Sequence, residues 1–338
     1  MHQCGGALSF PWYVRRCLTR PCLPRLTGSL LDIRPGRQVV KACIDEGCSY
    51  LDICGEPEFI EAIELEYHEE AKDRGVFVAS ACGFDSVPVD VGNALVRNAF
   101  PAKGCCSIET FIELHSGPSG LVLHYPTYAS AVHGLGSVKE LQRLRKEARG
   151  KMTTEVEKSA FPVPMRAAGS YAKEVDKYVI PFIGADASVV KRSERATGFM
   201  PSSRVYMCLP SRFRFWQFSL YGGLFKTLAG FEFGRNLLLS YPKLFCPIVS
   251  KQGPSPDQLR ETTFKVTLVG NGFEDDTSTK PDKTVRLEVS GMFSSSRSPI
   301  TLSRRLFSHS RSLSSRPRAG IPYVLDLHRG GRQGSRAW

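Results

Sequence analysis

The sequence lacks the short motifs that identify the most common catalytic and metal-binding sites. Its 338 residues contain no GxSxG nucleophile elbow, no HExxH zinc motif and no GxxxxGK(S/T) phosphate loop. The eleven cysteines include no CxxC pair and no Cys/His cluster with zinc spacing. No apolar run reaches the ~18 uncharged residues of a membrane-spanning helix. These absences exclude an elbow-type serine hydrolase, a HExxH protease, a P-loop NTPase and a zinc finger, and no metal site is predicted.

A recognisable secretory signal is also missing. Residues 1–31 have neither an unbroken apolar core nor a small-residue cleavage pattern. Together with scattered cysteines of odd number, this favours an intracellular protein with reduced thiols over a secreted one. The Arg-rich, acid-poor start also allows a mitochondrial transit peptide, although Pro11, Pro21 and Pro24 would interrupt its amphipathic helix.

The excess of positive charge lies at the two ends of the chain. The sequence has 45 Lys and Arg against 33 Asp and Glu, a net charge of +12. Residues 1–37 hold six Arg against one Asp, and residues 292–338 hold nine Arg against one Asp, so the body between them is nearly neutral. A neutral body gives no reason to expect a nucleic-acid partner. We expect the basic start to be poorly ordered and the Ser/Arg-rich tail to be disordered, because the tail has too few apolar residues to offset the entropy of folding.

Residues 38–104 alternate helical and strand patterns. Residues 48–53 and 76–81 are short apolar runs, as in strands that are covered on both faces. A helix is predicted between them, because Pro57 suits a first helical turn and Gly75 a helix end. This order is typical of α/β layering with parallel strands.

The pattern changes in residues 105–291. Residues 107–115, 260–270 and 284–289 alternate apolar with polar side chains, which is typical of antiparallel strands with one solvated face. The sequence therefore predicts a second, α+β domain around an antiparallel sheet.

Residues 213–248 are the most apolar part of the chain. Charged residues interrupt the segment, among them Lys226, Glu232 and Arg235. Two interpretations stay open: a buried helix pair of the second domain, or a segment that lies in a membrane interface or on a lipid surface.

Two turns are candidates for a binding site. Each follows an apolar strand and opens a helix, and ligands of open parallel sheets bind outside the carboxyl ends of the strands. The candidate residues are Gly55 and Glu56 in the first turn and Gly83, Phe84, Asp85 and Ser86 in the second. A carboxylate such as Glu56 can accept hydrogen bonds from sugar hydroxyls, and glycine lets backbone approach a ligand. The structural alternative is that Glu56 favours the helix start by its charge, and that Asp85 or Ser86 is an ordinary N-cap.

Three histidines, His115, His124 and His133, are further candidates as acids or bases. A single histidine near an apolar strand is more often a structural residue, so the sequence assigns no catalytic role to any of them.

Five segments extend the two turns into a longer pattern. They are YLDICGEP at residues 50–57, GFDSVPVDVG at 83–92, HSGPSG at 115–120, IPF at 180–182 and SKQGP at 250–254. Together they closely resemble the saccharopine dehydrogenase-like oxidoreductases, over about residues 38–290. The wider family includes saccharopine dehydrogenases and bacterial trans-acting enoyl reductases of lipid synthesis.

The resemblance implies a Rossmann-type domain joined to an α+β domain, and NAD(P) as the cofactor. Residues 38–104 would be the remnant of the Rossmann-type domain, and both turns would face the nicotinamide half of the cofactor. The small-molecule substrate stays unidentified. The resemblance also implies an association with membranes and lipid droplets, which residues 213–248 fit.

The chain departs from this family in the segment that should bind the pyrophosphate of the dinucleotide. Family members open with a strand, a glycine-rich turn and a helix that receives the pyrophosphate. Residues 1–37 supply no such unit, and no GxGxxG occurs anywhere in the chain. The expected fold is therefore α/β with an incomplete Rossmann-type parallel sheet that lacks its first βαβ part. We expect NAD(P)H to bind weakly or not at all, and the alternative function is a non-enzymatic membrane-surface or lipid-droplet protein.

Overall fold

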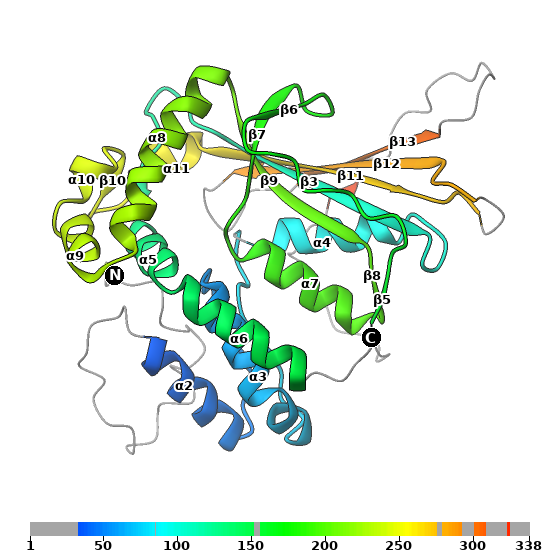
Figure 1. The fold of residues 1–338 in the computed structure, drawn as a ribbon, viewed down its shortest axis with the longest axis horizontal. Coiled ribbons are helices and arrows are strands. Elements are labelled where there is room, and N and C mark those ends of the chain that lie inside the picture. Colours follow the sequence, from blue (N-terminus) through cyan, green and yellow to red (C-terminus); the bar gives the residue numbers. More distant parts are fainter. Residues whose placement is uncertain are drawn as a thin grey trace.

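A small parallel strand pair with its helices and a long, mostly antiparallel sheet make up the structure (Figure 1). It is a computed structural model that describes residues 33–84, 86–151, 156–275, 279–292, 301–308 and 323–324. Poor order is predicted for residues 1–37, of which residues 1–32 lie outside this described part, while residues 33–37 belong to the first described helix. Most of the tail that is predicted to be disordered and the candidate residue Asp85 also lie outside it.

The first part alternates helices and short strands in the predicted order. Its elements are α2 (Ile33–Asp45), β1 (Tyr50–Leu51), α3 (Pro57–Asp73), β2 (Val78–Ala79) and α4 (Val87–Arg97). β1 pairs in parallel with β2, with Tyr50 opposite Val78, and α3 crosses between them. Pro57 occupies the start of α3, where its missing N–H costs no hydrogen bond. The parallel pairing is confirmed, although both strands are shorter than the apolar runs.

Among the described residues, a sheet of eight strands forms the second part. Its strands are β3 (Cys105–His115), β6 (Ser170–Ala172), β7 (Lys177–Pro181), β9 (Ser202–Leu209), β11 (Thr263–Gly272), β12 (Lys283–Met292), β13 (Thr301–Ser308) and β14 (Tyr323–Val324). The strand order is β14-β13-β12-β11-β3-β9-β7-β6, and all neighbours are antiparallel except β3 and β9. The antiparallel sheet predicted for the second region is thus confirmed.

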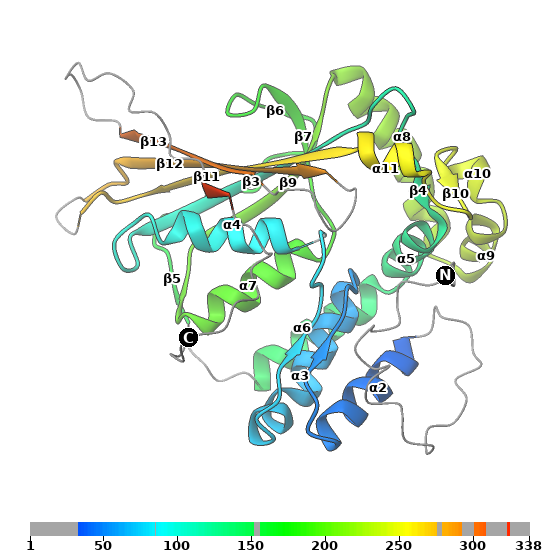
Figure 2. The same ribbon diagram turned by 180° about the vertical axis from the view of Figure 1, so that it is seen from behind.

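Two helices, α4 and α7 (Asp186–Ala196), cover one face of this sheet (Figures 1 and 2). Val89 and Val96 of α4 and Val190 of α7 join buried side chains of the central strands in the largest apolar cluster. The approach is close at Gly92, where a Cβ would lie 2.8 Å from Cδ1 of Leu268. The main core therefore lies between the helices and the sheet, and α4 belongs to both parts.

The predicted tail is not wholly disordered, because residues 301–308 form β13. All eight of its residues pair with β12, from Lys283 opposite Ser308 to Ser290 opposite Thr301. The prediction considered side-chain burial alone. A strand edge, however, offers unpaired N–H and C=O groups that another strand can satisfy whatever its side chains.

Four further helices gather at one end of the molecule (Figures 1 and 2). They are α5 (Tyr125–Gly136), α8 (Arg212–Ala229), α9 (Glu232–Ser240) and α10 (Pro242–Phe245), beside the short parallel pair β4 (Leu123–His124) and β10 (Val249–Ser250). The other described elements are α6 (Val138–Lys151), α11 (Pro256–Glu261) and the pair β5 (Glu157–Lys158) and β8 (Phe199–Met200).

The apolar segment at residues 213–248 is helical, but it is not a buried pair. Within α8 only Ala229 is buried, and it packs with Leu238 of α9 and Val132 of α5. Most large apolar side chains of α8 face outward instead. In the part of the chain that the structure describes, no helix combines the length and the apolar character needed to cross a bilayer.

Candidate functional site

Asp52, directly after β1, ties the ends of the two parallel strands together. Its Oδ1 accepts hydrogen bonds from the backbone N–H of Cys54 at 2.9 Å and of Ala81 at 3.0 Å. Its Oδ2 accepts one from the hydroxyl of Ser80 at 3.1 Å. Ala81 has a φ of +59°, an unfavourable value for a residue with a Cβ, and the bond to Asp52 holds it there. Asp52 is buried, and burial raises the pKa of its carboxyl.

Glu56 faces a helix of the second part rather than capping its own. It occupies the N-cap position of α3, but its side chain accepts no capping hydrogen bond there. Its carboxylate instead accepts hydrogen bonds from the thiol of Cys54, at 2.5 Å, and from the hydroxyl of Ser130 on α5. Burial raises the pKa of Cys54 and keeps it a thiol. Gly55, between them, is half-buried.

His133 lies one turn beyond Ser130 on α5. Its Nε2 is buried and has no hydrogen-bond partner among the described residues. Burial and the charge of Arg235 lower the pKa of His133, while Glu56 opposes the shift. The neutral imidazole therefore leaves a buried nitrogen without a hydrogen-bond partner among the described residues, on the same helix as the Ser130 hydroxyl that bonds to Glu56.

The second turn lies against the first. A Cβ at Gly83 would lie 3.4 Å from Cγ2 of Ile53, in ordinary contact. Phe84 packs into the main core, with its ring centroid 4.6 Å from that of Phe264. Ser86 is buried at the N-cap position of α4, but its side chain accepts no capping hydrogen bond from that helix.

The structure thus brings Gly55, Glu56 and Gly83 to one edge of the parallel strand pair. Phe84 instead packs into the main core, and Ser86 lies at the start of α4. Of the other two candidate histidines, His115 has a local partner, because its Nε2 lies 3.6 Å from Oε2 of Glu113. Nδ1 of His124 is buried and, like Nε2 of His133, has no hydrogen-bond partner among the described residues.

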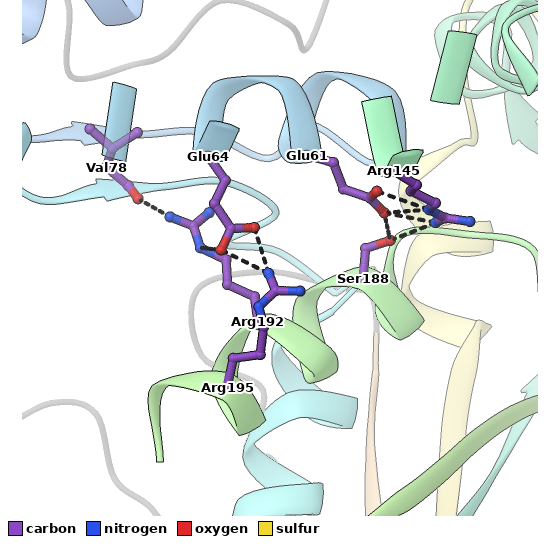
Figure 3. Close-up of polar contacts among 7 residues, drawn as sticks. All are labelled: Glu61, Glu64, Val78, Arg145, Ser188, Arg192 and Arg195. Carbon is purple, nitrogen blue, oxygen red and sulfur yellow. Dashed lines mark hydrogen bonds and ion pairs between the residues drawn. The ribbon is translucent and has the colours of Figure 1, made fainter. Parts of the chain in front are cut away.

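Two glutamates of α3 attach the first part to the second (Figure 3). Glu61 pairs with Arg145 of α6 at 2.7 Å and accepts a hydrogen bond from Ser188 of α7 at 2.7 Å. Glu64 lies one turn further along α3, and both of its carboxylate oxygens accept a hydrogen bond from Nη2 of Arg195 at 2.7 Å. These contacts hold α3, and with it the Glu56 turn, in place.

Sequence reasoning missed Ser130, Arg235 and the anchoring role of Asp52. The only available signal was that Asp52 follows a buried strand. Among the described residues, no group of three His, Cys, Asp or Glu side chains could hold a metal ion.

Comparison with known proteins finds similarity over about three quarters of the chain. A mouse saccharopine dehydrogenase-like oxidoreductase is 37% identical over 257 residues, covering 73% of this chain and 58% of the mouse protein. A lipid droplet localized protein of Caenorhabditis elegans is 32% identical over 250 residues, covering 71% and 58%. A protein of Arabidopsis thaliana, described as a probable mitochondrial saccharopine dehydrogenase-like oxidoreductase, is 30% identical over 290 residues, covering 76% and 63%.

The chain spans about three fifths of the length of these relatives. A scan against protein-family models finds no match.

Proposed function

Because the chain belongs to the saccharopine dehydrogenase-like oxidoreductases, we propose that its two turns form the nicotinamide end of an oxidoreductase site. The unit β1–α3–β2 would be the retained edge of a Rossmann-type sheet. The observation that carries the proposal is the Asp52 carboxylate, which holds the first turn and the end of β2 together. That edge, outside the carboxyl ends of parallel strands, is where ligands of α/β sheets bind.

The residues at this edge fit one half of a dinucleotide. Gly55 and Gly83 leave the backbone accessible, Glu56 can accept a hydrogen bond from a hydroxyl, and the buried Nε2 of His133 on α5 has no partner among the described residues that a ligand would have to displace. When bound, the nicotinamide would supply or accept the hydride. The residues of this chain would orient it and, through His133, hold a proton. No GxGxxG is available for the pyrophosphate.

We expect the chain to bind NADH only weakly and by its nicotinamide half. Without the phosphate contacts, the dissociation constant should be no tighter than about 1 mM. In saturation-transfer NMR at millimolar NADH, nicotinamide protons should receive more saturation than adenine protons, and Glu56→Ala should remove the difference.

The control for this experiment is Glu69→Ala on the exposed side of α3, which should leave the NMR pattern unchanged. Micromolar affinity would contradict the expected weakness. Adenine protons saturated as strongly as nicotinamide protons would contradict the assignment of the edge.

A second candidate function, docking on a lipid surface, rests on the outward-facing side chains of α8 to α10. Phe213, Leu220, Phe233 and Leu244 are each about three quarters exposed, and Trp216 is 62% exposed. Soluble proteins rarely leave so many large apolar groups together in water, and such surfaces mark contacts with membranes or other proteins. The printed name of the worm relative, a lipid droplet localized protein, favours the lipid surface.

The pair of substitutions Trp216→Ser and Leu220→Ser should release the protein from lipid. Each side chain buried in an interface contributes about 1 to 2 kcal/mol, so the pair should lower co-flotation with phosphatidylcholine liposomes about tenfold or more. Phe77→Ser, which removes an equally exposed aromatic ring from the first part, is the control. Equal losses in both variants would contradict a surface confined to α8–α10.

A further inference from the structure

A groove of about 380 Å³ is lined by residues of α9, α10 and β10. These elements lie at the same end of the molecule as α8 (Figure 1). The lining of the groove includes Tyr241, Lys243, Leu244, Val249, Lys251 and Gln252. Two side chains of the lining carry ammonium groups, several others are apolar or aromatic, and no lining residue is acidic. This combination suits a molecule with an apolar portion and an anionic head.

The surrounding surface has the same sign of charge. Residues 212–252 carry six basic side chains and a single acidic one, Glu232. The basic side chains are Arg212, Arg214, Lys226, Arg235, Lys243 and Lys251. The body of the chain as a whole is nearly neutral, so the positive charge is concentrated where the large apolar side chains are exposed. Basic and apolar side chains together are typical of proteins that bind anionic lipid surfaces.

Lys251 is exposed, but a contact with an aromatic ring favours one position of its ammonium. Its ammonium lies 5.7 Å from the centroid of the Tyr125 ring, within the range of a cation–π contact. The hydroxyl of Tyr125 donates a hydrogen bond to the carbonyl of Leu239 at 3.2 Å, which fixes the ring against α9. The turn after Lys251 needs a glycine: Gly253 has a φ of +80°, and a Cβ there would lie 2.3 Å from Cδ2 of His124.

The rim of the groove is apolar and exposed. Leu244 is 73% exposed and Tyr241 60% exposed. A tyrosine with its ring in an apolar layer and its hydroxyl in water is common at the boundary between lipid tails and headgroups. An isolated phosphate ion would leave this rim uncovered, whereas a lipid in a bilayer would cover the rim and reach the lysines.

We propose that this groove binds the phosphate-bearing headgroup of an anionic phospholipid, between Lys243 and Lys251. The inference rests on the proposed docking of α8–α10 on a lipid surface and adds which lipids that surface selects. The apolar side chains supply affinity for any bilayer, and the groove supplies the preference for anionic headgroups.

The test compares co-flotation of the full chain with vesicles of phosphatidylcholine alone and of phosphatidylcholine mixed with phosphatidic acid. The unchanged protein should bind the acidic vesicles more tightly. Lys243→Gln combined with Lys251→Gln should lower affinity for acidic vesicles about tenfold and leave binding to phosphatidylcholine unchanged. Both lysines are exposed, so the variant should fold, which its thermal unfolding checks.

Arg212→Gln combined with Arg214→Gln is the matched control, because it removes two positive charges from the same surface outside the groove. It should retain most of the preference for acidic vesicles. The proposed headgroup site in the groove would be overturned if both double variants lost the same affinity for acidic vesicles, or if the unchanged protein showed no preference for acidic vesicles. Failure to bind either kind of vesicle would overturn the lipid-surface function itself.

Discussion

Glu194→Gln should make the protein more stable at about pH 8, by on the order of 3 kcal/mol, and leave its stability unchanged at about pH 4. Glu194, on α7, is buried at 2% exposure between the helix and the sheet. Burial raises the pKa of its carboxyl to about 7, against the ordinary 4.5, and the hydrogen bond from Ser203 offsets this only in part. The folded protein therefore favours the protonated form.

The direction of the pH dependence follows from that shift. Below the ordinary pKa of 4.5, Glu194 is protonated in both the folded and the unfolded chain, so its ionisation takes nothing from the free energy of unfolding. As the pH rises from there through about 7, the unfolded chain ionises more readily, and stability is lost. Glutamine keeps the contact with Ser203 but cannot ionise.

Urea unfolding over this range of pH measures the effect. Glu69→Gln, an exposed glutamate, should show no such difference from the unchanged protein. A Glu194→Gln variant that is less stable at high pH would show that Glu194 is held as a carboxylate.

Glu64→Gln should loosen the attachment of the first part to the second. The Glu64 side chain is only 10% exposed, and the substitution removes the charge that Arg195 and Arg192 face (Figure 3). Leaving a guanidinium without its carboxylate at such a site costs about 2 to 3 kcal/mol. Hydrogen exchange of the α3 amides should accelerate accordingly.

Glu66→Gln is the matched control on the same helix. Glu66 pairs with Arg37 at 2.6 Å, but both side chains are about one third exposed, so its loss should cost less than about 1 kcal/mol. Equal acceleration in both variants would show that Glu64 stabilises only α3 itself and not the contact between the two parts.

Local pattern was enough to predict the elements whose burial is regular. The two apolar runs became a parallel pair, Pro57 marks the start of α3, and the alternating segments became strands of the large sheet. The surroundings of Glu56 could not be predicted in this way. Ser130 is 74 residues away in the sequence, and only the packing of α5 against the turn makes it a partner.

The apolar segment shows a different limit. Its side chains are apolar all round the helix, so periodicity could not say which side would find a partner. The answer depends on how much of α8 the neighbouring helices α5 and α9 cover, and they leave most of it open. The strand at residues 301–308 was missed for the reason already given: backbone pairing needs no apolar pattern.

One consequence of the shared Asp52 anchor concerns motion. Since a single carboxylate bonds to the backbone at Cys54 and at Ala81, neither loop can shift without pulling on the other. A molecule that settles against one loop therefore stiffens both, and the entropy of ordering the pair is lost in a single step.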